Sequence, residues 1–247
     1  MAHLAADFHL LLALTLLLMA VLYSSVGHGG ASGYLAAMIF WGLSVEVMRP
    51  AALAMNIVVT GWLLYRFKPY QLIPYRLFWP LVLAATPMAF VGGYWRVDSE
   101  LYRWLVGCLL LVAAVQMVRS STWPEVTHSP PLWVSIPVGG TIGFMAGVTG
   151  IGGGVFLSPL LLIFGWCTMR QSAAIAAGFI LLNSASGLAG YFASGQSWPA
   201  AGGWMLVAAL AGCLLGAELA TRRASTPLLK RLLAVVLAIA GLKMLVI

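Results

Sequence analysis

Two glycine clusters interrupt long apolar stretches of this chain at matching places, one at 27–30 and one at 150–154. Glycine adopts a left-handed backbone and lets other groups approach closely, so such a cluster can break a helix. A helix that restarts after the break presents free N–H groups and the positive end of its dipole. These features bind anions without a charged side chain. The clusters therefore predict an anion-binding site.

Polar side chains flank both clusters and would supply hydrogen bonds to a substrate. Asn56 and Asn183 lie in the apolar segments that follow Arg49 and Arg170, where each could line a substrate path or bond across helices. The candidate substrate-binding residues are Ser25, His28, Gly29, Gly30, Ser32, Asn56, Gly150, Gly152, Gly153, Gly154, Ser158 and Asn183.

His28 is the titratable group inside a glycine cluster, and ionisable residues inside a membrane are functional candidates. It could donate a hydrogen bond to an anion, or take up a proton and couple transport to pH. A histidine that only bonds a nearby carbonyl is the alternative. The second cluster has Ile151 at the matching place, so any role of His28 is asymmetric.

Residues for catalysis or for a bound cofactor are missing from the pattern. The four histidines have no metal-ligand spacing, and no Gly-Lys-Ser/Thr follows either glycine cluster. Cys108, Cys167 and Cys213 are scattered singly, which is typical of packing residues, although a thiol that acts on a sulfur compound is an alternative. No carboxylate lies deep in an apolar segment, which argues against a cation carrier. We predict no enzyme, no cofactor and no metal site.

The composition defines the elements that must position these residues. Hydrophobic residues make up 62% of the 247 and charged residues 8%, and Arg170 is the only charged residue between Val126 and Ala217. This is the composition of a polytopic helical membrane protein, in which each crossing helix needs about 20 residues. Ten apolar segments occur, at 8–26, 31–47, 50–66, 76–95, 100–118, 132–149, 153–167, 170–193, 199–218 and 226–247.

These segments form two similar halves. Gly27, Gly29, Gly30 and Gly42 align without a gap on Gly150, Gly152, Gly153 and Gly165, and after a two-residue shift Arg49 aligns on Arg170. We predict a first repeat at 1–118, a linker at 119–131 and a second repeat at 132–247, which together form one membrane domain. The short segments 31–47 and 153–167 either cross the membrane or form re-entrant half-helices, which gives eight to ten crossings.

Five segments in each half are an odd number, so the second repeat should have inverted topology. With both termini outside, nine Lys and Arg residues fall in inside loops and four outside, as the positive-inside rule requires. The net charge of +7 therefore orients the protein and does not indicate nucleic acid. We expect Arg49 and Arg170 near opposite faces, where each either guides anions or anchors its helix.

The run Gly143–Gly154, followed by Ser158 and Pro159, resembles the glycine-rich signature of the TauE/SafE family of sulfite exporters. The stretch from Ser24 to Phe67 resembles the paired signature, although it has Ala36 where the second half has Pro159. The resemblance covers nearly the whole chain. It implies an inner-membrane carrier of the bacterial type for small sulfur-containing anions such as sulfite, sulfonates or thiosulfate.

We therefore expect a secondary transporter with a small anionic substrate, embedded in the lipid bilayer, that works by alternating access around a site between the two glycine breaks. Three alternatives stay open from the sequence. They are a passive anion channel, a permease for another carboxylate or a neutral solute, and a sulfur-handling membrane protein that uses its cysteines. The sequence specifies no oligomeric state.

Overall fold

The computed structural model describes residues 2–25, 29–67, 72–119, 130–199, 202–222 and 227–246. Over these residues the protein is built from ten α-helices, without any strand. The helices are α1 (Ala2–Ser25), α2 (Ala31–Phe40), α3 (Val45–Phe67), α4 (Tyr75–Tyr94), α5 (Ser99–Arg119), α6 (Leu132–Thr149), α7 (Gly154–Ile163), α8 (Met169–Ala193), α9 (Gly202–Arg222) and α10 (Pro227–Val246).

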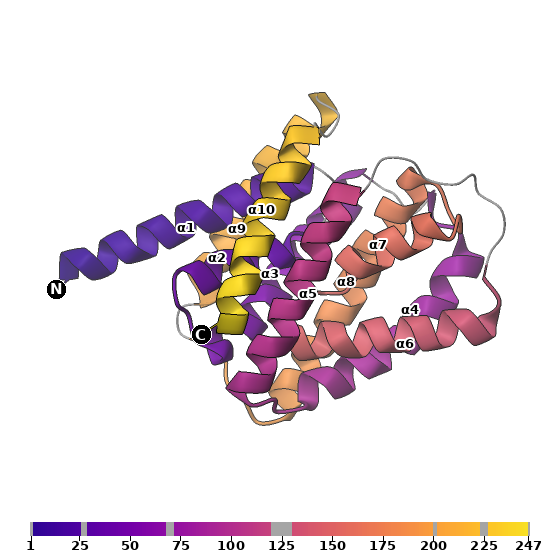
Figure 1. Ribbon diagram of the computed structural model, residues 1–247, viewed down its shortest axis with the longest axis horizontal. Helices are drawn as coiled ribbons and strands as arrows, with labels where there is room; N and C mark the ends of the chain where they lie inside the picture. Colours follow the sequence, from indigo (N-terminus) through magenta and orange to yellow (C-terminus); the bar gives the residue numbers. More distant parts are fainter. Residues whose placement is uncertain are drawn as a thin grey trace.

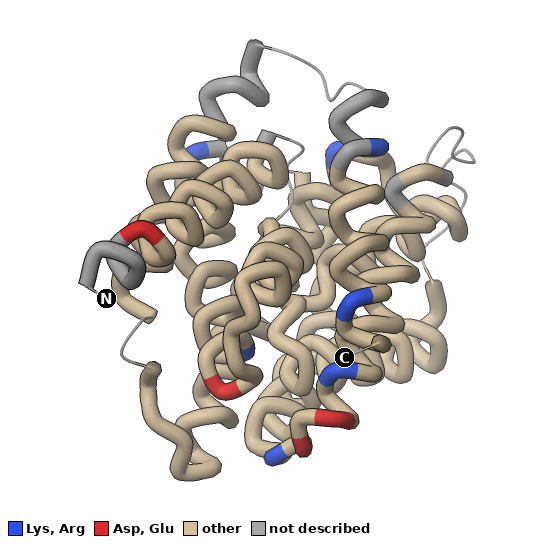
Figure 2. The backbone as a smooth tube through the Cα atoms, turned by 60° about the vertical axis from the view of Figure 1, so that its left-hand side comes forward, with Lys and Arg blue, Asp and Glu red and all other residues tan. Residues whose placement is uncertain are grey.

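Six of the described helices, α1, α3, α4, α5, α6 and α8, are long and apolar enough to cross a membrane. In α9 and α10 the described apolar parts, 202–216 and 233–246, are shorter. Figure 2 shows most of the charged residues near the two ends of the helix bundle, with an uncharged tube between them. This distribution suits a protein whose middle lies in lipid.

The short helices α2 and α7 are half-helices. Each has ten residues, which span about 15 Å, half of a hydrocarbon core of about 30 Å. Gly42 and Gly165 follow them with φ of 70° and 62°, a left-handed conformation that ends a helix. The possibility that all ten segments cross the membrane is therefore wrong, because these glycines stop segments 31–47 and 153–167 early.

Helix α2 folds back along α1 instead of continuing its direction. Trp41, at the end of α2, donates from Nε1 to Thr15 Oγ1 at 3.2 Å, and its ring meets the edge of Phe8 at 5.3 Å. Thr15 and Phe8 lie in the first part of α1, far from the break at its end. The first glycine cluster thus joins a full helix to a re-entrant half-helix.

The two halves interlock through equivalent helix pairs. In the repeat, α1 corresponds to α6 and α4 corresponds to α9. The packing of α1 against α9 is therefore equivalent to the packing of α6 against α4. Helices α3 and α8 pack on each other, as do α5 and α10. Figure 1 shows α4 and α6 side by side at one end of the molecule and α5 beside α10 near its middle. The predicted all-α polytopic fold is confirmed, and the repeat boundaries at 118 and 132 stay a prediction, because 120–129 lie outside the described residues.

Buried apolar side chains form two clusters. The larger one joins α1, α2, α3, α5, α9 and α10, and the smaller one joins α4, α6, α7 and α8. Val155 at the start of α7 belongs to the larger cluster, whereas Leu157 and Leu161 belong to the smaller one. The half-helix α7 therefore lies where the two packed units meet.

The arginines that seemed to mark equivalent positions in the halves are not equivalent. Arg49 is the fifth residue of α3 and is buried, whereas Arg170 is the second residue of α8 and is exposed. Counted from the helix starts, Arg49 corresponds to Ala173, because α3 begins three positions after Gly42 and α8 begins four positions after Gly165, opposite in direction to the two-residue shift of the alignment. The alignment of Arg49 on Arg170 is wrong for this reason.

Candidate functional site

Each half-helix begins at a glycine in the left-handed conformation. Gly30 precedes α2 with φ 85°, and Gly153 precedes α7 with φ 81°. Neither helix has a side chain that caps its first N–H groups. Gly150, with φ 83°, ends α6 and donates its N–H to the carbonyl of Ala146 at 2.9 Å. Both half-helices thus start with donors that no capping side chain occupies.

The two breaks lie on either side of one side chain, that of Ile180 in α8. A Cβ atom placed on Gly29 would be 3.2 Å from Ile180 Cδ1, and one placed on Gly152 would be 2.9 Å from Ile180 Cγ2. A Cβ on Gly154 would be 2.6 Å from Ile180 Cγ1. These distances leave no room for a side chain at the three glycines, so the breaks and the middle of α8 form one compact centre.

Helix α3 brings polar side chains to the same centre. Asn56 is fully buried, and its Nδ2 donates to Ser184 Oγ of α8 at 3.2 Å. A Cβ on Gly152 would lie 2.6 Å from Asn56 Nδ2 and 3.2 Å from Ser184 Oγ. Thr60 stands against the other break, with its Cγ2 2.9 Å from a Cβ on Gly29. Its hydroxyl donates to the carbonyl of Asn56 at 2.6 Å.

The twofold relation between the two halves of the fold also applies to the residues of this centre. Thr60 and Ser184 are both the sixteenth residues of their helices, and Thr60 faces Gly29 as Ser184 faces Gly152. Asn56 and Ile180 are both the twelfth residues. The two halves therefore build one site with twofold character, in which an amide on one side corresponds to a hydrocarbon on the other.

Several predicted binding residues contact other helices and do not line this centre. Ser32 is buried and donates to the hydroxyl of Tyr23 at 2.9 Å, inside the contact of α1 with α2. The three atoms nearest to a Cβ on Gly153 would all be carbons, among them Ile142 Cγ2 at 2.8 Å and Phe179 Cε1 at 2.9 Å. His28 and the side chain of Ser25 lie outside the described residues.

Two other predicted residues are buried without a hydrogen-bond partner. Ser158 Oγ in α7 has none, nor do Nδ2 and Oδ1 of Asn183 in α8. The free acceptor of Asn56, its Oδ1, also has no partner. Buried polar atoms of this kind are expensive unless a ligand or water satisfies them. The amide of Asn56 adjoins Gly152, so its free acceptor favours a polar ligand group beside the second break.

The sequence analysis did not predict three residues of the centre, which are Thr60, Ile180 and Ser184. Thr60 lies one helical turn after Asn56, so the helical period could have placed it on the same face. Ser184 could have been found from Thr60, because both are the sixteenth residues of their helices. Ile180 has no signal of its own, since one more isoleucine in an apolar helix looks like packing.

Arg49 holds the helices around the second break. Its Nε donates to the carbonyl of Gly147 at 3.1 Å, Nη1 to Trp95 at 3.0 Å and Nη2 to Gly93 at 2.8 Å, with a further bond from Nη2 to the Gly92 carbonyl. The guanidinium thereby occupies carbonyls at the ends of α4 and α6. Of the two roles expected for Arg49, these bonds support anchoring.

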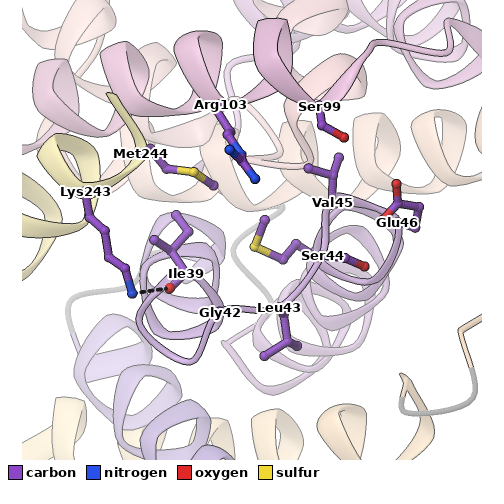
Figure 3. A pocket seen from close by; sticks show the side chains of 11 residues that line it. Ile39, Gly42, Leu43, Ser44, Val45, Glu46, Ser99, Arg103, Lys243 and Met244 are labelled. Carbon is purple, nitrogen blue, oxygen red and sulfur yellow. Dashed lines mark hydrogen bonds between the residues drawn. The ribbon is translucent and has the colours of Figure 1, made fainter. Parts of the chain in front are cut away.

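The far end of α2 is held by a lysine of α10. Lys243 Nζ donates to the carbonyls of Ile39 at 3.0 Å and Phe40 at 3.1 Å, a favourable place for a cation at a helix C-terminus. A cavity of about 230 Å³ lies beside it, with Glu46 and Arg103 among its lining residues. Figure 3 shows the Lys243–Ile39 bond on one side and Arg103 on another.

The chemistry available at the centre is that of hydrogen-bond donors and hydrocarbon. Among the described residues, no group of three or more His, Cys, Asp or Glu side chains could hold a metal ion. The cysteines are free thiols, with Cys167 and Cys213 buried and Cys108 exposed.

Two short helices that begin at glycine breaks around one buried centre are typical of multi-pass membrane transporters. The chain belongs to the sulfite exporter TauE/SafE family, whose family model matches residues 12–244. It is similar to a probable membrane transporter protein of Sinorhizobium fredii, with 36% identity over 239 residues that cover 95% of this chain and 97% of the relative.

A second relative matches a smaller part of the chain. A probable membrane transporter protein of Methanocaldococcus jannaschii is 31% identical over 96 residues, which are 38% of this chain and 36% of the relative. No solved structure gives a significant match. The family and the first relative together support a membrane transporter.

Proposed function

We propose that the protein is a secondary transporter of small sulfur-containing anions, of the sulfite, sulfonate or thiosulfate class, which bind between the two glycine breaks. The observation that carries the proposal is the contact of Gly29, Gly152 and Gly154 with the single side chain of Ile180. It brings the starts of both half-helices to one place. The family supplies the sulfur-containing class of substrate.

The electrostatics of the centre favour an anion. Each half-helix start carries about half a positive charge from its dipole, and the two starts converge. Asn56 and Ser184 add an amide and a hydroxyl, and both are buried. Arg49, whose carbonyl adjoins Gly150, donates to backbone carbonyls, so the substrate would be held by neutral donors.

The two apolar clusters suggest how access alternates. Helices α4, α6, α7 and α8 form one packed unit, and the other six helices form the second. The breaks and the α3–α8 contact lie between these units. A rocking motion of one unit against the other would open the centre to each face in turn.

Coupling to protons is part of the proposal and depends on His28, which directly precedes Gly29 in the first break. A histidine there could be protonated near neutral pH and would then strengthen anion binding. Its role is tested by transport at pH 5 to 8 with the wild-type protein and His28→Ala. Identical pH profiles for the two proteins would dismiss proton coupling through this residue.

The proposed function is tested with purified protein in proteoliposomes and a panel of sulfite, thiosulfate, methanesulfonate, sulfate, phosphate and acetate. We expect uptake of one or more of the sulfur anions that saturates with concentration and is blocked by the others. Preference for acetate or phosphate would reject the sulfur class. Large unitary currents in planar bilayers would reject a carrier and indicate a channel.

A further inference from the structure

The two breaks differ in the atoms that face them. Around Gly29 the nearest atoms are all carbon: Thr60 Cγ2 at 2.9 Å, Ile180 Cδ1 at 3.2 Å and Ile180 Cγ2 at 3.3 Å from a Cβ position. Around Gly152 they include Asn56 Nδ2 at 2.6 Å and Ser184 Oγ at 3.2 Å. One side of the centre is therefore apolar, and the other side is polar.

The polar side has unused hydrogen-bonding capacity. Asn56 Oδ1 is buried and has no partner, and its Nδ2 makes one bond, to Ser184, although an amide NH2 can donate twice. These atoms adjoin Gly152, in the break that precedes α7. An unpartnered and fully buried amide beside a helix start indicates a place for a polar ligand group.

The apolar side is filled by one residue that breaks the twofold character of the site. Ile180 occupies the position in α8 that Asn56 occupies in α3. Its methyl and methylene carbons reach Gly29, Gly152 and Gly154. A residue with this position controls how much space remains between the breaks, because its own carbons fill that space.

We infer that Ile180 sets the size of the substrate and that the site has two compartments, an inference that rests on the proposed function. The charged group binds at the second break, with Asn56 and Ser184. A small apolar substituent of the same anion points to the first break, against Ile180 and the methyl group of Thr60. The ligand class is an anion with a short hydrocarbon substituent, for which the short alkyl sulfonates are suitable probes.

The test is the order of affinities along a series of one charged group with growing chains: sulfite, methanesulfonate, ethanesulfonate, propanesulfonate and butanesulfonate. Binding is measured by calorimetry with the wild-type protein, Ile180→Val and Ile180→Ala in detergent. Isoleucine to valine removes one carbon, and isoleucine to alanine removes three. We expect the best-bound chain to be longer by about one carbon in the valine variant and by up to about three in the alanine variant, with a gain of about fourfold for each methylene accommodated.

Ile175→Ala is the matched control. Ile175 is a buried isoleucine of the same helix, but it packs into the smaller apolar cluster with Phe78 and Leu161. It should lower thermal stability as Ile180→Ala does and leave the order of the sulfonates unchanged. If Ile180→Ala fails to fold, the valine variant alone still decides, since its change is a single carbon.

Ser184→Ala tests the polar compartment. It should weaken every sulfonate by a similar factor and leave the preferred chain length unchanged. An unaltered order in both Ile180 variants, or a changed order in Ser184→Ala, would overturn the two compartments while the transport of sulfur anions stood. Failure of the wild-type protein to bind sulfite and every sulfonate would remove the proposed function together with this inference.

Discussion

Asn56 combines two properties that suit a binding residue: it is fully buried, and its side chain makes a single hydrogen bond, to Ser184, while its Oδ1 stays without a partner. A residue that only joined α3 to α8 would be expected to satisfy both ends of its amide. The open acceptor and the contact with Gly152 favour a role for this amide in substrate binding over a role only at a helix interface.

Replacing Asn56 by alanine should weaken substrate binding by about tenfold or more, because hydrogen bonds to charged groups contribute about 1.5–3 kcal/mol. The measurement is the dissociation constant of the transported anion in detergent. Ser135→Ala is the control, since Ser135 is a buried hydroxyl at the start of α6, bonded to the carbonyl of Pro131. Equal affinity in the wild type and Asn56→Ala would remove this residue from the site.

Arg49 is a second single residue with a testable role, in the stability of the fold. Arg49→Met leaves the carbonyls of Gly147, Gly93 and Trp95 without their donor, and an unsatisfied buried group costs about 1–3 kcal/mol. We expect the thermal midpoint in detergent to fall by several degrees. Arg170→Met removes an exposed arginine and should change the free energy of unfolding by less than about 0.5 kcal/mol. Equal midpoints for Arg49→Met and Arg170→Met would contradict the anchoring role.

At the scale of the helices, close glycine contacts fix the distance between neighbours. Along α6, Gly139, Gly143 and Gly147 face the backbone carbonyls of Leu81, Ala85 and Ala89 in α4. In the equivalent pair of the other repeat, α9 and α1, Gly212 and Gly216 face the carbonyls of Leu17 and Val21. Without a hydrophobic driving force in lipid, such backbone contact is a main source of helix association.

Gly143→Ala should therefore separate α4 from α6, since its Cβ would overlap the carbonyl and Cα of Ala85. Overpacking of this kind costs about 1–3 kcal/mol, and backbone cannot move aside as a side chain can. We expect a lower thermal midpoint and a lower yield of folded protein. Gly140→Ala on the same helix is the control, because its Cβ would lie 3.6 Å from Met88 Cγ, an ordinary contact. A stable Gly143→Ala protein would refute the tight crossing.

The sequence predicted the two helix breaks, in which the backbone must adopt a positive φ, because glycine favours that conformation. Gly30, Gly150 and Gly153 have positive φ, so the breaks followed from residue type. The ends of the half-helices did not, because segments 31–47 and 153–167 were expected to run past Gly42 and Gly165. The equivalence of Arg49 and Arg170 failed, because the alignment assumed a turn two residues shorter before α8, whereas that turn is one residue longer and places Ala173 at the position equivalent to Arg49. Ile180 could not be identified, because its importance arises only from the three glycines that fold around it.

At the scale of the whole molecule, helices of one half pack against helices of the other, and the two glycine breaks lie where the two packed units meet. The proposed alternating access needs one unit to rock against the other, and two separately packed units are compatible with that motion. Orientation in the membrane is a further property of the whole chain, and the excess of Lys and Arg in predicted inside loops predicts that both termini lie outside. Short tags at the two ends should react with a membrane-impermeant reagent on intact cells. Labelling that requires permeabilised cells would reverse the orientation.

The most direct test of a substrate site at the breaks is saturable anion uptake into proteoliposomes by two glycine variants. Gly152→Ala and Gly42→Ala impose the same strain, since the glycines have φ of 78° and 70°, but only Gly152 adjoins Asn56 and Ile180. A Cβ at Gly42 meets nothing within 4 Å. We predict that Gly42→Ala transports sulfur anions with nearly the wild-type KM and that Gly152→Ala loses saturable uptake while it remains folded. Wild-type uptake by Gly152→Ala would contradict a binding site between the breaks.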